Sequence, residues 1–121
     1  MQHATHAYQK TALETANLRE LESNLLFKSA AHFQAIRDNW GDRQEELNGA
    51  LLFNRKLWTL LLSSVTRDDN PLASDVRKGV ANLGLFVMNQ TIKLMSNPEP
   101  DVLGALININ VRLATGLQGK C

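Results

Sequence analysis

The chain has 121 residues, which suits one domain whose core needs no disulfide bonds. Hydrophobic residues make up 44% and charged residues 21%, as in folded globular proteins, so wholesale disorder is excluded. Thirteen basic and twelve acidic residues give a net charge of +1, which argues against a dedicated nucleic-acid binder. The sequence has no apolar run long enough for a transmembrane helix and no signal-peptide pattern at its start. We therefore expect a cytoplasmic protein without membrane contact.

Two regions differ in hydrophobic pattern. The first sixteen residues show no sustained period, and we expect residues 1–16 to form a flexible N-terminal arm. Residues 17–118 are expected to form one helical domain. Twenty leucines against ten valines and isoleucines favour helix, because unbranched side chains lose less rotamer freedom there.

The helical domain contains four stretches with apolar residues at three- and four-residue steps. These stretches predict helices near residues 18–39, 43–67, 71–96 and 100–117. Short connections between amphipathic helices favour antiparallel packing. The sequence thus predicts an all-α fold, a compact four-helix bundle-like domain with a short mobile N-terminal arm. On the second helix, Trp58 shares its face with seven other candidate core residues and should be buried.

Capping residues and helix breakers set the predicted boundaries. The expected signals are Asn17 opening the first helix, Gly41 ending it in the left-handed conformation, Asp42 opening the second helix, Asn70 with Pro71 opening the third, and Pro100 opening the fourth.

The second and third helices carry more apolar surface than a four-helix core needs. Phe53 and Leu60 form an extra strip on the second helix, and Leu85 and Ile92 form one on the third. Either the third helix is central and touched from several sides, or a strip is left for a partner or for self-association into a homodimer. We expect these four residues, together with Lys56, to be the partner-binding residues.

No arrangement of residues indicates catalysis, so we expect no enzyme activity, no cofactor and no metal site. His3 and His6 resemble a pair of metal ligands but lack a third ligand and a rigid frame. His32 lies near the apolar face of the first helix and is interpreted as a hydrogen-bonded structural histidine. Cys121 is interpreted as a free thiol.

Three amide side chains interrupt the apolar stripes: Asn54, Gln90 and Asn110. A buried amide left unpaired costs about 1–3 kcal/mol, so each should find a partner. The main interpretation is a core network that fixes the helix register.

Several short motifs follow one another along nearly the whole chain. They are Ala7-Tyr8, Arg37-Asp38-Asn39-Trp40, Asn54-Arg55-Lys56-Leu57-Trp58, Leu85-Phe86-Val87-Met88-Asn89-Gln90-Thr91, and Leu106-Ile107-Asn108-Ile109-Asn110 with Gly116-Leu117. In this order they resemble the flagellar regulator family FlaF.

The resemblance implies a set of motif residues with a mainly structural role: Asn54, Arg55, Trp58, Thr91 and Asn110. The sequence departs from the family pattern at Gln90 and Val111, where basic residues are usual, and at Leu18, where proline often opens the first helix.

The resemblance also implies a small cytoplasmic, non-enzymatic protein that promotes flagellin production after transcription. It would act opposite the translational regulator FlbT and as a chaperone for flagellin before export. Flagellin and a FlbT-like regulator are therefore the expected partners. The terminal segments of flagellin become amphipathic helices in the filament, and an apolar groove could receive them.

The alternative is an RNA-binding translational regulator of flagellin mRNA, acting directly or with a partner protein. Its contacts would come from the basic residues Arg55, Lys56, Arg77, Lys78 and Lys93.

Overall fold

Helix α1 is the longest element of the protein. The computed structural model describes the backbone of residues 2–119 and the side chains of residue 14 and residues 16–119. Within it, α1 spans Gln2–Asp38. The helix is this long because it contains no glycine or proline and is rich in good helix formers. The predicted start near Leu18 is therefore wrong, residues 2–16 are helical, and Asn17 lies inside the helix.

The remaining elements are also helical, and no strand occurs within residues 2–119. They are α2 (Trp40–Arg43), the 3-10 helix η1 (Gln44–Glu46), α3 (Leu47–Val65), α4 (Ser74–Ser96) and α5 (Pro100–Leu117). The predicted all-α class with four main helices is confirmed.

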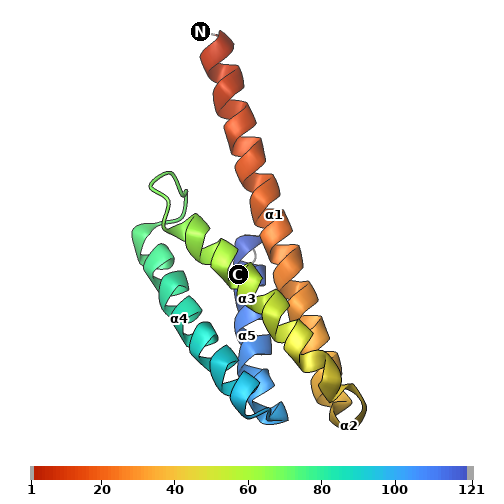
Figure 1. Ribbon diagram of the computed structural model, residues 1–121. Helices are drawn as coiled ribbons and strands as arrows, with labels where there is room; N and C mark the ends of the chain where they lie inside the picture. The colour runs from red at the N-terminus through yellow and green to blue at the C-terminus, as the bar shows by residue number, and fades with distance from the viewer. Residues whose placement is uncertain (1, 120–121) are drawn as a thin grey trace.

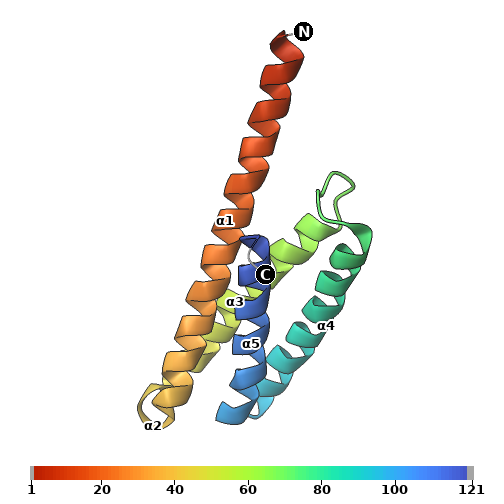
Figure 2. The same ribbon diagram turned by 180° about the vertical axis from the view of Figure 1, so that it is seen from behind.

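The helices form a bundle in which α3 bridges the two sides. In Figures 1 and 2, α5 runs antiparallel beside α1, and α3 crosses α5 at an angle. The N-terminal part of α1 projects beyond the other helices. Helix α4 lies at the outer edge and packs against α3 and α5. The alternative of a central third helix is therefore wrong, because only one narrow face of α4 is buried.

The turn after α1 differs from its prediction. Gly41 lies in the short helix α2 and does not end α1 in the left-handed conformation. The second long helix starts at Leu47 because residues 40–46 are divided between α2 and η1. Asp42 does not open this helix; its N-cap is Glu46, whose side chain makes no capping hydrogen bond.

The loop between α3 and α4 serves the end of α3 rather than the start of α4. Helix α4 begins at Ser74, so Asn70 does not cap it. Asn70 Nδ2 instead donates to the carbonyl oxygen of Ser64 at 2.9 Å. Arg77 Nε donates to the carbonyl oxygen of Val65 at 2.7 Å. These bonds satisfy carbonyl groups that a helix C-terminus leaves unpaired. The predicted start of α5 at Pro100 is confirmed.

The core lies where α1, α3 and α5 meet, and α4 adds one face to it. Trp58 is 0% exposed, which confirms its predicted burial. The largest fully buried apolar side chains around it are Leu26, Phe33, Ile36, Leu51, Leu61, Leu94, Leu103 and Leu106.

Gly84 lets α4 approach α3 closely. A Cβ atom at this position would lie 2.5 Å from Leu62 Cδ2 and 3.0 Å from Leu62 Cγ. A side chain at this position would therefore have to displace the side chain of Leu62.

We predict that Gly84→Val lowers the free energy of unfolding by about 1–3 kcal/mol, because the added atoms overpack the contact with Leu62. Denaturant unfolding measures the change. Gly79→Val is the matched control, since a Cβ at Gly79 meets no atom within 4 Å. The control should shift stability by less than about 0.5 kcal/mol. Equal losses at both positions would contradict the prediction.

Candidate functional site

A chain of buried hydrogen bonds joins α1, α3 and α5. Trp58 Nε1 donates to Asn110 Oδ1 at 2.9 Å, and Asn110 Nδ2 donates to Asn54 Oδ1 at 2.8 Å. The Ser29 hydroxyl donates to the same Asn54 oxygen at 2.9 Å. All four side chains are buried. The expected core network is thus present, but it contains Ser29 and not Gln90, which is only partly buried.

The Trp58 indole fixes the direction of every bond in this network. An indole N–H can only donate, so Asn110 must present its oxygen to Trp58 and its amino group to Asn54. Asn54 then presents its oxygen to both neighbours. Asn54 Nδ2 is left with no hydrogen-bond partner among the described residues. Leaving this group unpaired costs about 1–3 kcal/mol, which the three buried hydrogen bonds must offset.

The other two motif residues lie in different surroundings. Thr91 is buried, and its hydroxyl donates to the carbonyl oxygen of Val87 at 2.7 Å within α4. Arg55 is exposed and makes no ion pair among the described residues. The motif of α3 therefore points in two directions: Asn54 and Trp58 inward, and Arg55 outward.

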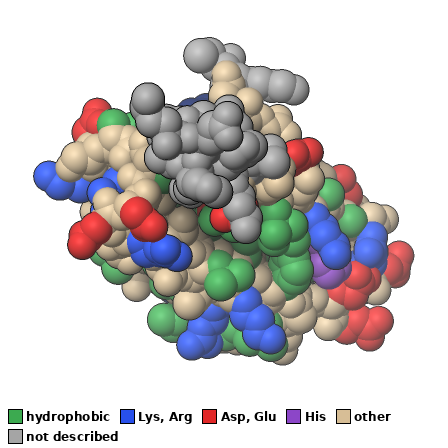
Figure 3. Space-filling view, turned by 90° about the horizontal axis from the view of Figure 1, so that it is seen from above, with side chains coloured by type: hydrophobic (Ala, Val, Ile, Leu, Met, Phe, Trp, Pro, Cys, Tyr) green, Lys and Arg blue, Asp and Glu red, His purple; other side chains and the backbone are tan. Residues whose placement is uncertain are grey.

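The outward face of α3 is apolar and bordered by basic residues. Leu60 is 65% exposed and Leu52 is 47% exposed. Both line a shallow hollow together with Arg55, Lys56 and Thr59. In Figure 3, hydrophobic side chains lie beside Lys and Arg side chains along the lower edge of the view, over α3.

The structure brings together only part of the predicted partner-binding set. Lys56 and Leu60 share the hollow on α3. Phe53 is partly buried at the seam between α1 and α3, where Lys28 Nζ lies 5.6 Å from its ring centroid. Leu85 and Ile92 are each 64% exposed on α4, outside the α3 hollow.

Leu52 was missed in the sequence. Its position four residues before Lys56 and eight before Leu60 places it on the same helical ridge. That spacing was the available signal.

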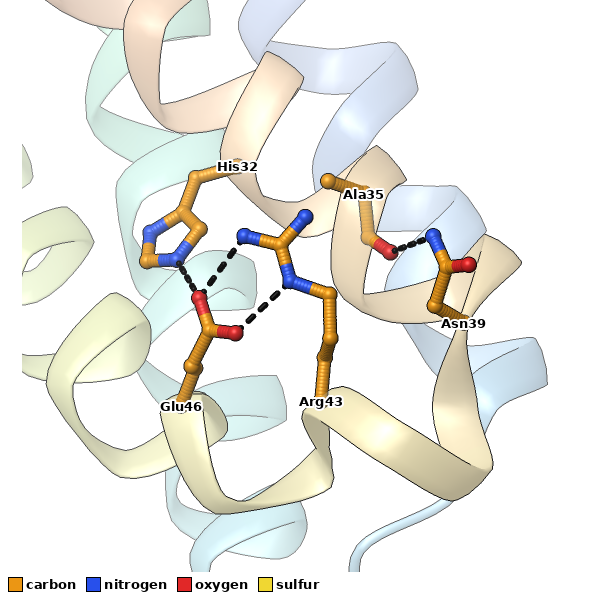
Figure 4. A network of polar contacts seen from close by, with 5 residues as sticks. All are labelled: His32, Ala35, Asn39, Arg43 and Glu46. Carbon is orange, nitrogen blue, oxygen red and sulfur yellow. Dashed lines mark hydrogen bonds and ion pairs between the residues drawn. The ribbon is translucent and has the colours of Figure 1, made fainter.

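A polar cluster fastens the turn between α1 and α3 (Figure 4). Arg43 Nε donates to Glu46 Oε2 at 2.7 Å, and His32 Nε2 is hydrogen-bonded to Glu46 Oε1 at 3.0 Å. The interpretation of His32 as a hydrogen-bonded structural histidine is confirmed. Hydrogen bonds from Arg43 and then from His32 lower the pKa of Glu46 to about 2. Asn39 Nδ2 also donates to the carbonyl oxygen of Ala35 at 3.0 Å, at the end of α1.

A second hollow lies between α1 and the ends of α3 and α5. Its lining includes Leu18, Arg19 and Glu22 from α1, together with Leu113 and Leu117 from α5. Burial raises the pKa of the Glu22 carboxyl, and the nearby Arg19 partly opposes that shift. Among the described residues, Glu22 is the only carboxyl group in this lining, so they provide no pair of acids for acid–base catalysis.

No group of three or more His, Cys, Asp or Glu side chains suited to a metal ion occurs at residue 14 or residues 16–119. His3, His6 and Cys121 lie outside these described side chains. No helix in the described part of the chain is long and apolar enough to cross a bilayer.

The buried network and the outward face of α3 belong to a sequence pattern that covers nearly the whole chain. The family model for the flagellar protein FlaF matches residues 4–117. The chain belongs to the FlaF family. No curated protein and no solved structure gives a match. Of the three positions where this FlaF-family chain is expected to depart from the usual pattern, Gln90 is partly buried, and Val111 and Leu18 are exposed.

We predict that Trp58→Ala destabilises this FlaF-family chain by about 3–5 kcal/mol, because a fully buried ring and the donor to Asn110 are both lost. Guanidinium unfolding measures the change. Trp40→Ala is the matched control, since Trp40 is only partly buried, and it should cost clearly less. Similar losses for the two variants would contradict the central role of the network.

The Glu46 cluster predicts a specific pH dependence. The pKa of Glu46 is about 2 in the folded protein and 4.5 ordinarily, so the unfolded chain takes up the proton first as the pH falls. The stabilisation from this carboxylate is complete above about pH 4.5 and is lost towards pH 2. Melting temperatures of the wild type and Glu46→Gln should therefore differ near neutral pH and converge near pH 2. A difference that stays constant with pH would contradict this assignment.

Proposed function

We propose that this chain is a flagellin-directed regulator of flagellin synthesis and flagellum biogenesis. It acts in the cytoplasm after transcription, as an export chaperone that binds flagellin and catalyses no reaction. The observation that carries the proposal is the FlaF family match over residues 4–117. A FlbT-like translational regulator is a second proposed partner.

The exposed apolar side chains support a binding role. Large apolar residues outside the core lie on both α3 and α4, among them Leu52, Leu60, Leu85 and Ile92. An amphipathic helix can bury such residues by laying its apolar stripe against them. Flagellin segments that become helical only in the filament need their apolar residues buried against such a surface before export.

The charged clusters support binding rather than catalysis. The Glu46 carboxylate is engaged by Arg43 and His32 in fastening a turn. The described residues that line the hollow of Glu22 include no second carboxyl group. Neither arrangement presents an acid and a base to a common substrate position.

The second candidate, an RNA-binding regulator of flagellin mRNA, is favoured by one observation. Lys56, Lys78 and Lys93 are exposed and make no ion pair among the described residues. Arg77 is less available, because its Nε and Nη2 donate to the carbonyl oxygens of Val65 and Arg67. The remaining cations form a small electrostatic footprint for RNA.

The salt dependence of binding distinguishes the two candidate functions. We predict that the pure protein forms a complex with flagellin monomer that persists from low to near-physiological salt, because burial of apolar surface is not screened. Binding to flagellin leader RNA should be weak and should fall steeply as salt rises. Isothermal titration calorimetry with each partner measures both.

Two outcomes would contradict the proposal. One is the absence of any flagellin complex at either salt concentration. The other is RNA binding that resists salt while flagellin does not bind, which would instead support the RNA-binding regulator.

A further inference from the structure

Helices α3 and α4 hold most of the unbalanced positive charge of the molecule. Helix α3 contains Arg55 and Lys56 and no acidic residue. Helix α4 contains three basic residues and Asp75 as its one acidic residue. Five basic residues against one acidic residue lie on these two helices, although the whole chain has a net charge of only +1. These two helices therefore carry a local excess of positive charge.

The basic side chains of α3 border its apolar residues directly. Arg55 and Lys56 line the same hollow as Leu52 and Leu60, and none of the described residues that line it is acidic. Neither cation makes an ion pair among the described residues. Lys28, on the neighbouring α1, adds a third cation over the Phe53 ring. The outward face of α3 is thus an apolar ridge with unneutralised cations beside it.

The spacing on this ridge matches a second helix. Leu52, Lys56 and Leu60 follow at four-residue steps, so the two leucines lie about 12 Å apart along the axis at the usual helical rise. Apolar residues seven apart on a partner helix span about 10.5 Å, a comparable length. Carboxylates that border such a stripe would meet Arg55 and Lys56.

We propose that the outward face of α3 (Leu52, Arg55, Lys56 and Leu60) docks an amphipathic helix whose apolar stripe is bordered by Asp and Glu. This proposal rests on the proposed function in one respect, namely that the docked helix is a segment of flagellin. Leucines at the centre of the face favour a helix over RNA, because no aromatic side chain among the described residues lines this hollow for base stacking.

The competing strip on α4 has less suitable charge. Leu85 lines none of the hollows described above. Ile92 lies in a hollow that also contains Glu99 beside Lys93. A negative charge in that lining would repel an acidic border, whereas the α3 hollow contains only basic and uncharged residues.

Leu60→Ser and Leu85→Ser form a matched pair, because both leucines lie in helices and are 65% and 64% exposed. The probes are flagellin monomer and two synthetic helical peptides with the same leucine stripe, one bordered by Glu and one by Lys. The wild type should bind flagellin and the Glu-bordered peptide, and it should bind the Lys-bordered peptide at least about tenfold more weakly.

Leu60→Ser should weaken binding of flagellin and of the Glu-bordered peptide by about tenfold or more, whereas Leu85→Ser should weaken it by less than about twofold. Lys56→Glu should shift the preference towards the Lys-bordered peptide, with an unchanged melting temperature showing that the fold is intact.

Several results would overturn the docking face. One is that the two peptides bind equally well. Another is that Leu85→Ser loses peptide binding while Leu60→Ser keeps it. A third is that no peptide binds and Leu60→Ser disrupts a homodimer. Salt-sensitive RNA binding that disappears in Lys56→Glu, without peptide binding, would also overturn it. If Leu60→Ser leaves flagellin binding unchanged, the docking face is contradicted, but the proposed function is not. If the protein binds the Glu-bordered peptide but not flagellin, the proposed function is contradicted, but the docking face is not.

Discussion

The indole N–H of Trp58 is the constraint on which the packing of three helices depends. Because it can donate but not accept, it fixes the orientation of Asn110, and Asn110 in turn fixes Asn54. Ser29 completes the chain from α1. A one-residue slip of α3 or α5 would leave buried amide groups unpaired, and a slip of α1 would leave the Ser29 hydroxyl unpaired, at about 1–3 kcal/mol for each group. The network therefore selects one register where an apolar core would tolerate several.

The same segment of α3 holds the core together and presents a surface. Successive residues of a helix point about 100° apart, so Asn54 and Trp58 can enter the network while Arg55 and Lys56 face solvent. A docking face built on this segment is preorganised, because the network fixes the helix that carries it. Docking to it orders little new backbone, which keeps the entropic cost of binding low.

Polar groups elsewhere are used to finish helices and turns. Glu46 fastens the turn after α1, Asn70 satisfies a carbonyl group at the end of α3, and Arg77 satisfies two more. These charges and amides are thereby engaged within the protein. The basic residues on the outward face of α3 have no such partners among the described residues, and this distinguishes a surface available for binding from one that serves the fold.

The sequence by itself determined the all-α class, the four main helices and the burial of Trp58, because a 3.6-residue period is a local property of the chain. Its motifs, read in order, also indicated the family. Only the tertiary structure decided that Asn70 bonds to the end of α3, that α4 lies at the edge, and that Ser29 replaces Gln90 in the network. Short capping motifs compete with the packing of whole helices, and the choice of hydrogen-bond partners depends on residues far apart in the chain. Periodicity contains neither kind of information.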